Sequence, residues 1–493
     1  MNRHSIRDPR ALLTSLHLAA VQGANPFVRT RDAVGEWLRV PTAGAIRRIH
    51  IFALGKAGAT MASGAVRALQ QHGIEPVGGV IVVAVRPEPD AAAENGGALP
   101  VILEVRIGDH PVPDLGSLAA ADVIARKVQD VVPGDIALVL ISGGATSLCA
   151  APCRELREFC GHAINAHELI TALAETLHAG GLAIHEMNAI RRRLLRWGAG
   201  RLAIALAERG VASIPVFAVS DVIGDDPSVI GSGPCSPDPV TEAEFFAMLD
   251  AYDLRVKLPN ELAIALGFAG DANQVIVPPV ADHAAFSLVQ YSIVARNRDA
   301  CNAMADAARA LDIEDVTVVA TPVMGEAETV GHAIASLALR AVSLSDREQL
   351  IIWGGEPTVS MSDTARIFDG GDEGLLPDIH TAEIPHGGRM QALALAASLA
   401  LEQAMLSRSD AAARITVLAA GTDGRDGPTD ACGAVIDCDT PYNARRHGRD
   451  PIRDLHRYRS YPALNAADAL LKTGSTGTNV MDVVAVHIRA GNR

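Results

Sequence analysis

Aspartates gather where two apolar runs of the sequence end. Residues 417–430 read VLAAGTDGRDGPTD, so three aspartates follow an apolar run on a segment rich in turn residues. A second group, Asp221, Asp225 and Asp226, follows the apolar run 213–220. Carboxylates are the hard oxygen ligands that Mg²⁺ takes in phosphoryl-transfer sites, and a further carboxylate can orient or deprotonate an attacking hydroxyl. Both groups are therefore candidates for metal binding and base catalysis.

A glycine-rich stretch offers a site for an anion. Residues 142–147 read SGGATS and follow the apolar run 135–142. Backbone N–H groups and three hydroxyls ahead of a potential helix form a cradle that suits phosphate. The stretch is not a Walker A loop, because GxxxxGK[ST] does not occur in the sequence. GxGxxG does not occur either, which counts against a nicotinamide cofactor.

Two cations stand next to glycines at comparable positions. Lys56 follows Gly55 after an apolar run, in a chain with only three other lysines. A cation at a helix start opposes the helix dipole, and a bound anion would remove this mismatch. Arg389 follows Gly387 and Gly388 at the start of a strongly apolar helical pattern, and its forked guanidinium suits phosphate or carboxylate. Each feature taken alone also has a structural interpretation, since glycines make turns and Asp or Ser caps helices.

The elements that would position these residues alternate along the chain. Strands are predicted at 48–54, 79–85, 101–107, 135–142, 213–220, 291–296, 315–321, 348–353, 414–420 and 482–488. Helices are predicted at 57–72, 116–130, 199–210, 298–312, 327–343 and 389–406. This alternation predicts an α/β fold with two domains, 1–288 and 289–493, each a mostly parallel Rossmann-like sheet flanked by helices. In parallel sheets ligands bind at the carboxyl ends of the strands, which is where the candidate residues fall.

The composition restricts the class of protein. The chain has 493 residues, 49% of them apolar, and a net charge of −14, which argues against nucleic acid as a partner. Its seven cysteines form no CxxC pair and are expected to be reduced thiols of a cytoplasmic protein. Neither a signal-peptide pattern nor an apolar stretch of about 18 residues occurs, so no membrane partner is expected. The sequence leaves the oligomeric state open, with a homodimer as one option.

Eight motifs occur in a fixed order along the chain. They are ALGKAGATMA (53–62), GDHPVPD (108–114), LISGGATSL (140–148), VSDVIGDDPSVIGSGPCSPDP (219–239), GGEPTV (354–359), GGRMQALALA (387–396), GTDGRDGPTDACGAV (421–435) and STGTNVMD (475–482). The set resembles the class II glycerate kinases, ATP-dependent glycerate 2-kinases with a C-terminal MOFRL domain, some of which are labelled hydroxypyruvate reductase. The resemblance implies two α/β domains with the active site in the cleft between them. It also implies ATP, Mg²⁺ and phosphorylation of a small hydroxy acid at its 2-hydroxyl, by default D-glycerate to 2-phosphoglycerate.

The resemblance also assigns roles to the candidate residues. Lys56 and Arg389 match the lysine and arginine of the family's site, and Asp221 and Asp423 match its carboxylates, so these four are predicted to be catalytic. The residues predicted to hold the nucleotide or the acid's carboxylate are Ser142, Gly143, Gly144, Thr146, Ser147, Gly355 and Glu356. Those predicted to bind the metal are Asp225, Asp226 and Asp426.

Several positions depart from the family pattern. Within NAIRRRLLRWGAG (188–200), Arg193, Leu195 and Gly198 replace a histidine, a serine and a lysine. The other departures are Pro357, Met390, Ala392 and Ser475, and the polar segment 362–386 is longer than the family requires. We expect these changes to affect the substrate side. Three alternatives therefore stay open: a kinase for a different small hydroxy or sugar acid, an NAD(P)H-dependent hydroxypyruvate reductase, and a non-catalytic ligand-binding homologue.

Overall fold

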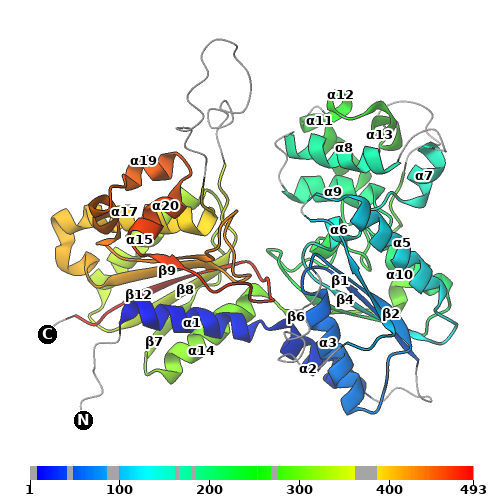
Figure 1. The fold of residues 1–493 in the computed structure, drawn as a ribbon, viewed down its shortest axis with the longest axis horizontal. Helices are drawn as coiled ribbons and strands as arrows, with labels where there is room; N and C mark the ends of the chain where they lie inside the picture. Colours follow the sequence, from blue (N-terminus) through cyan, green and yellow to red (C-terminus); the bar gives the residue numbers. More distant parts are fainter. Residues whose placement is uncertain are drawn as a thin grey trace. The chain divides into compact units, whose positions relative to one another are not determined.

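The computed structural model describes residues 8–40, 48–85, 99–110, 112–160, 166–179, 184–252, 254–267, 276–360 and 386–491. The chain forms two compact units, which we describe separately (Figure 1). The N-terminal unit is Pro26–Ala295, and the C-terminal unit combines Met1–Asn25 with Arg296–Arg493. The expected long polar segment 362–386 lies outside the described residues except for His386.

The N-terminal unit contains the predicted parallel sheet. Its six strands have the order β3-β2-β1-β4-β5-β6, and every pair of neighbours is parallel. Their bounds are β1 Ile49–Leu54, β2 Gly78–Val83, β3 Leu103–Ile107, β4 Ile136–Ile141, β5 Ile214–Val219 and β6 Val289–Ala295. Strands β1, β2, β4 and β5 are buried along their whole length, as continuous apolar runs in a doubly covered parallel sheet require.

Helices of this unit fall into two groups. Those that flank the sheet are α2 (Pro26–Arg39), α3 (Gly58–Gln71), α5 (Leu115–Gln129), α6 (Ala145–Leu148) and α10 (Arg201–Glu208). The others form a separate helical layer with its own apolar core, visible at one end of the unit in Figure 1. They are α7 (Arg154–Cys160), α8 (Ala166–Ala179), α9 (Ile184–Leu194), α11 (Glu242–Ala251), α12 (Leu254–Lys257) and α13 (Asn260–Ala265).

The second sheet is mixed, so the prediction of two mostly parallel sheets is wrong for the C-terminal unit. Its order is β11-β10-β9-β12-β8-β7, and only β7 and β8 pair in parallel. The bounds are β7 Asp315–Val318, β8 Gln349–Gly355, β9 Ile415–Gly421, β10 Gly433–Ile436, β11 Leu470–Leu471 and β12 Asp482–Ile488. One reason is the connection from β9 to β10, a loop with no crossover helix, which gives an antiparallel pair. Strand β12, which follows β11 through another such loop, enters the sheet antiparallel to both of its neighbours, β9 and β8.

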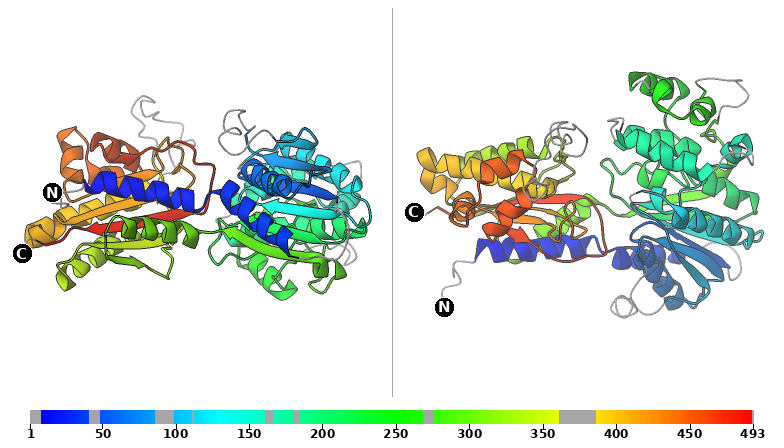
Figure 2. Two further views of the ribbon diagram at one scale, coloured as in Figure 1. Left: turned by 90° about the horizontal axis from the view of Figure 1, so that it is seen from below. Right: turned by 45° about the horizontal axis from the view of Figure 1, so that its top comes forward.

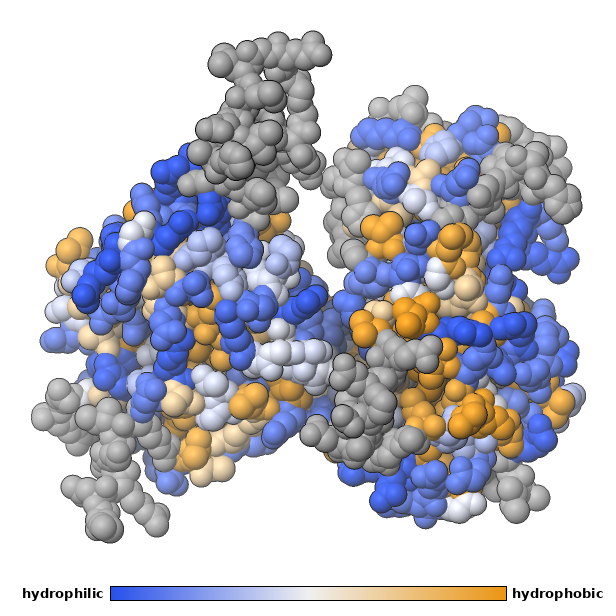
Figure 3. Space-filling view, viewed as in Figure 1, coloured by the Kyte–Doolittle hydropathy of each residue, from blue (hydrophilic) through white to orange (hydrophobic). Residues whose placement is uncertain are grey.

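Helices cover both faces of the second sheet. In Figure 1, α15 (Ala327–Leu344) and α17 (Arg389–Ala412) lie on one face, and α1 (Pro9–Gly23) and α14 (Asn297–Ala310) on the other. The short helices α18 (Thr440–Arg446), α19 (Pro451–His456) and α20 (Ser460–Ala466) pack beside α17 (Figure 2). In Figure 3, hydrophilic residues cover much of each unit's visible surface, with apolar residues exposed among them.

The compact units differ from the predicted domains at the boundary between them and at the N-terminal helix. Strand β6 lies beyond the predicted boundary at 288, yet it pairs with β5 and completes the first sheet. Helix α1 belongs to the C-terminal unit, where its buried His17 Nε2 lies 3.1 Å from the carbonyl oxygen of Gly421. No helix in the described ranges has the length and apolarity that crossing a membrane would require.

Candidate active site

In the N-terminal unit, the loops after β1 and β4 are joined by hydrogen bonds. The backbone N–H of Lys56 donates to the carbonyl oxygen of Gly143 at 2.9 Å, and that of Ala57 donates to Ser142 Oγ at 3.0 Å. Gly55 has φ +124°, and a Cβ there would lie 2.3 Å from Ser142 Oγ. Glycine at this position therefore allows the two strand ends to approach each other.

Asp221, from the loop after β5, lies beside the loops that follow β1 and β4. A Cβ on Gly143 would lie 1.7 Å from Asp221 Oδ2. A Cβ on Gly144, which has φ +83°, would lie 3.2 Å from Lys56 Cγ and 3.1 Å from His110 Cδ2. The structure thus brings together Lys56, Asp221 and the two glycines, as predicted from strand ends, and adds His110. We call these five residues the lysine cluster.

Lys56 is the cation of this cluster. Its side chain is exposed, and no carboxylate among the described residues lies within ion-pair distance of its ammonium group. A charge held at the carboxyl end of a parallel strand without a protein partner is available to an anionic ligand.

His110 is a site residue that the sequence reasoning did not assign. Its pKa is lowered to about 4, mainly because surrounding protein atoms displace water from part of the ring, and further because Lys56 is positively charged. The residue as a whole is exposed. At neutral pH the imidazole is therefore uncharged and can offer a donor and an acceptor. His110 belongs to the motif GDHPVPD, but its place in the site follows from its position beside Gly144 and the charge of Lys56, which the sequence does not show.

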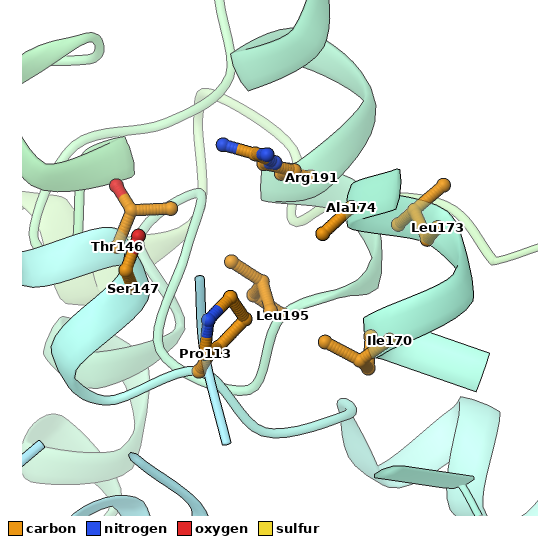
Figure 4. A pocket seen from close by; sticks show the side chains of 9 residues that line it. Pro113, Thr146, Ser147, Ile170, Leu173, Ala174, Arg191 and Leu195 are labelled. Atoms are coloured by element: carbon orange, nitrogen blue, oxygen red, sulfur yellow. The ribbon is translucent and has the colours of Figure 1, made fainter. Parts of the chain in front are cut away.

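The remaining hydroxyls of the cradle lie on α6, beside a small cavity (Figure 4). Thr146 Oγ1 is 2.8 Å from Ser232 Oγ, and Ser147 is buried with 9% of its surface exposed. Helix α6 begins directly after Gly144 but has only four residues, so its dipole is small. The cradle's attraction for an anion therefore rests on Lys56 and local N–H groups.

Asp225 and Asp226 lie further along the loop after β5. Asp225 has φ +55°, and Asp226 Oδ1 accepts a hydrogen bond from the backbone N–H of Ser228 at 2.8 Å. The charge of Asp226 also acts on the buried guanidinium of Arg192. Within the described part of the chain, no group of three or more His, Cys, Asp or Glu side chains has metal-binding geometry. Metal binding by these two aspartates stays a prediction.

Arg389 is the centre of a second cluster, in the C-terminal unit. Its Nε and one terminal nitrogen donate to the two oxygens of Asp482 at 2.6 and 3.2 Å. Its other terminal nitrogen lies 2.8 Å from Glu356 Oε1. Asp482 begins β12 and pairs in register with Gly355, at the end of β8, and Gly421, at the end of β9. The antiparallel β12 thus delivers a carboxylate to the strand ends where the prediction placed the site.

Burial controls the charges of this arginine cluster, which we define as Arg389, Glu356, Asp482, Asp426 and Asp423. Asp482 is 3% exposed, and burial raises its pKa to about 7 although Arg389 opposes the shift. Burial alone would lower the pKa of Arg389, but the negative charges of Asp482 and Glu356 raise it overall, so the guanidinium stays charged. Asp482 was missing from the predicted site because it reads as the first residue of an apolar strand.

Asp426 has a capping role in this structure. Its two carboxylate oxygens accept hydrogen bonds from the backbone N–H groups of Met390 at 3.1 Å and Gln391 at 2.8 Å, at the start of α17. A Cβ on Gly388 would lie 2.2 Å from Asp426 Cγ, so the close approach requires glycine. Burial raises the pKa of Asp426 to about 6. This geometry supports helix capping rather than the predicted metal binding.

Asp423 is better placed for a ligand. It is half-buried, and its Oδ1 accepts a hydrogen bond from the backbone N–H of Arg425 at 3.0 Å. Its negative charge contributes to the raised pKa of Asp426. The third aspartate of the stretch, Asp430, instead pairs with Lys472 at 3.0 Å on the surface.

Two departures from the family pattern take on a structural meaning. Met390 is fully buried in the apolar core of the C-terminal unit, so the expectation that it reshapes the substrate side is not supported. Gly198 lies against the end of α9, where an added Cβ would be 2.9 Å from the carbonyl oxygen of Arg192. A lysine at position 198 would therefore require the backbone to shift.

Comparison with known proteins fits this fold and these strand-end clusters. The chain matches a domain of unknown function (DUF4147) over residues 12–267 and the MOFRL family over residues 349–482. It therefore belongs to the MOFRL-containing class II glycerate kinase family. A glycerate 2-kinase of Pyrococcus horikoshii is 30% identical, over 89% of this chain and 86% of its own. A relative from Agrobacterium vitis, named "Putative hydroxypyruvate reductase", is 30% identical over 97% of this chain and 94% of its own.

A solved structure agrees with the fold of the whole chain. The crystal structure of a glycerate kinase from Thermotoga maritima superposes with a TM-score of 0.72 at 26% identity. The match covers 97% of this chain and 99% of that one.

Proposed function

We propose that this chain is an ATP-dependent kinase that phosphorylates the 2-hydroxyl of D-glycerate or of a closely related small hydroxy acid. Relatives named as glycerate 2-kinases match most of the chain, which supports the class of reaction. At the level of residues, the proposal rests on Lys56, whose ammonium has no carboxylate partner among the described residues and stands beside the loop Ser142–Ser147. Such a cation at a glycine-rich strand end can offset the charge of a transferring phosphoryl group.

The lysine cluster supplies the groups for the attack. Asp221 accepts the proton of the substrate's 2-hydroxyl as that oxygen forms a bond to the γ-phosphorus of ATP. The bond between this phosphorus and the bridging oxygen breaks, and its electron pair leaves with ADP. Lys56 offsets the negative charge on the transferring group, while the neutral His110 hydrogen-bonds a substrate oxygen without adding a second positive charge.

The arginine cluster contributes the Arg389 guanidinium, which is fixed in place and has N–H donors left for a ligand. A guanidinium has five N–H donors. Two bonds to Asp482 and one ion pair with Glu356 use three of them. The others can bind an oxygen of the nucleotide or of the acid's carboxylate. Asp482 and Glu356 fix the plane of Arg389, so they act as positioning residues.

The donors present also fit Mg²⁺, which takes one or two carboxylates and phosphate oxygens in such sites. Asp423 suits this task because it is half-buried and its Oδ1 alone accepts the Arg425 N–H. A bound Mg²⁺ would neutralise phosphate charge there. Asp426 fits less well, because each of its oxygens already accepts a backbone N–H.

The test compares Lys56→Met with Lys127→Met in ADP release from ATP and Mg²⁺ with D-glycerate and related acids. Lys127 is the matched control, because it forms ordinary surface ion pairs with Glu104 and Asp130. We expect turnover by the wild type and the control, and loss of about 10²–10³-fold in the Lys56 variant. Oxidation of NADPH by hydroxypyruvate without ATP would instead support the reductase. Binding of acid without any turnover would support a non-catalytic homologue.

A further inference from the structure

The backbone has an unusual conformation directly before the carboxylate that holds Arg389. Met481 has φ +66°, in the left-handed region that residues other than glycine, asparagine and aspartate rarely adopt. The next residue, Asp482, begins β12 and gives both carboxylate oxygens to Arg389 at 2.6 and 3.2 Å. An ordinary extended or helical conformation at Met481 would turn this carboxylate away from the guanidinium. The conformation of one residue therefore decides whether Asp482 and Arg389 meet.

The side-chain amide of Asn297 holds this turn from both sides. Asn297 is the first residue of α14, and its Nδ2 donates to the carbonyl oxygens of Val480 at 2.8 Å and Asp482 at 2.9 Å. These two residues come immediately before and after Met481. Carbonyl oxygens only accept hydrogen bonds, so the amide nitrogen of Asn297 has to face them. One side chain thus fixes the carbonyl groups on either side of the left-handed residue.

The carbonyl of Met481 itself is held from the end of β9. The buried Thr422 donates to it through its hydroxyl at 2.7 Å and through its backbone N–H at 3.1 Å. The same hydroxyl accepts a hydrogen bond from the backbone N–H of Val480 at 2.9 Å. Three consecutive carbonyls, those of residues 480–482, therefore have donors from the protein. Such a network is what a costly backbone conformation needs in order to persist.

The neighbouring strand leaves room for the amide of Asn297. Gly354, in β8, pairs in register with Val483, and a Cβ on Gly354 would lie 1.4 Å from Asn297 Oδ1. Gly354 is the first residue of the motif GGEPTV, of which only Gly355 and Glu356 were assigned to the site. The absence of a side chain at position 354 lets Asn297 reach β12. All of these residues belong to the C-terminal unit.

We propose that Asn297 is a positioning residue: it holds Met481 in the left-handed conformation, which aims Asp482 at Arg389 and so sets the orientation of the guanidinium. Its effect on the reaction rate rests on the proposed kinase function, whereas its effect on the contact between Asp482 and Arg389 does not. Because Asn297 acts through Asp482, its loss should lower the rate only while Asp482 is present.

A double-variant cycle tests this dependence. ADP release from ATP, Mg²⁺ and D-glycerate gives kcat for each variant, corrected for its folded fraction. Asn297→Ala should lower kcat about 10-fold to 100-fold, because a misplaced guanidinium no longer meets its ligand. In the Asp482→Asn background the same change should lower kcat by no more than about twofold. An equal loss in both backgrounds would overturn the inference. Asn302→Ala, at an exposed asparagine of the same helix, is the control and should leave kcat unchanged.

A glycine rescue tests the left-handed turn. Met481→Gly and Met481→Ala both remove most of the side chain, but only glycine adopts positive φ without cost. In the Asn297→Ala background, kcat should be about tenfold higher with glycine than with alanine at position 481. Equal rates there would overturn the inference. If Asn297→Ala does not fold, Asn297→Asp takes its place, because aspartate suits a helix start yet its carboxylate has no N–H to donate.

Failure of the kinase function gives a different result. Crystal structures of the wild type and of Asn297→Ala show the contact between Asp482 and Arg389 without any turnover. If the wild type releases no ADP, the kinase function fails, while an Asp482 carboxylate displaced from Arg389 in the variant would still support the inference. The same contact in both structures would overturn the inference, whatever the enzyme's activity.

Discussion

Replacing Asp482 by asparagine tests whether Arg389 is held by this carboxylate. At a pH above the raised pKa of Asp482, which is about 7, the change keeps the shape of the side chain but removes the charge that accepts two hydrogen bonds from Arg389, at 2.6 and 3.2 Å. Charge-assisted bonds of this kind contribute about 1.5–3 kcal/mol each, and losing one partner of a buried pair costs about 3–5 kcal/mol. Because 35% of the Arg389 side chain is exposed, solvent reduces the loss, and we expect about 3 kcal/mol.

The kinetic effect should exceed what the stability change alone would produce. Arg389 keeps its ion pair with Glu356 but loses the contact that fixes its plane. A misplacement of about 1 Å in a positioned group costs about 10²-fold in rate, so kcat should fall by about that factor. Urea unfolding followed by circular dichroism gives the stability, and ADP release gives kcat. The control is Asp430→Asn in the neighbouring loop, whose exposed pair with Lys472 should matter little. An Asp482 variant with unchanged kcat and unchanged unfolding midpoint would refute this reasoning.

Three further predictions concern single positions. Lys56→Met should leave the unfolding midpoint nearly unchanged while activity falls, because the described residues give its ammonium no ion pair to lose; a large drop in the midpoint would assign it a structural role. Gly143→Ala should displace Asp221, since the added Cβ would lie 1.7 Å from Oδ2, and so abolish most activity. Its control, Gly35→Ala in α2, has room for a methyl group and should be neutral or stabilising by up to about 1 kcal/mol. Full activity of Gly143→Ala would contradict the geometry of the cluster. For Asp426, a folded pKa of about 6 against an ordinary 3.8 means that the folded state holds the proton longer than the unfolded state. Its contribution to the free energy of unfolding is therefore full below pH 4 and falls by about 3 kcal/mol as the pH rises to 6 and above. Urea titrations of wild type and Asp426→Asn across this range should show a shallower slope in the variant, and equal slopes would refute the assignment.

The sequence predicts the N-terminal unit well because its strands are long apolar runs. β1, β4 and β5 are fully buried, and their polar ends carry Lys56, Gly143 and Asp221 into the lysine cluster. Parallel strands with crossover helices align their carboxyl ends, so identifying the strands is enough to predict which residues meet.

In the C-terminal unit, identifying the strands is not enough to predict which residues meet. β12 has the same apolar pattern as β9, and nothing local in it indicates that it runs antiparallel between β8 and β9. Its first residue, Asp482, therefore joins Arg389 through topology rather than through a motif. Asp426 is a second case, since a carboxylate in a loop reads equally as a metal ligand and as a helix cap. Only the position of α17 shows the cap.

The most direct test of the proposed function is to identify the product by ³¹P NMR after incubating the protein with ATP, Mg²⁺ and D-glycerate. We predict ADP and a phosphate monoester on the 2-hydroxyl, formed by the wild type and not by Lys56→Met. Release of inorganic phosphate alone, a phosphate on the 3-hydroxyl, or equal yields from wild type and variant would contradict the proposed function.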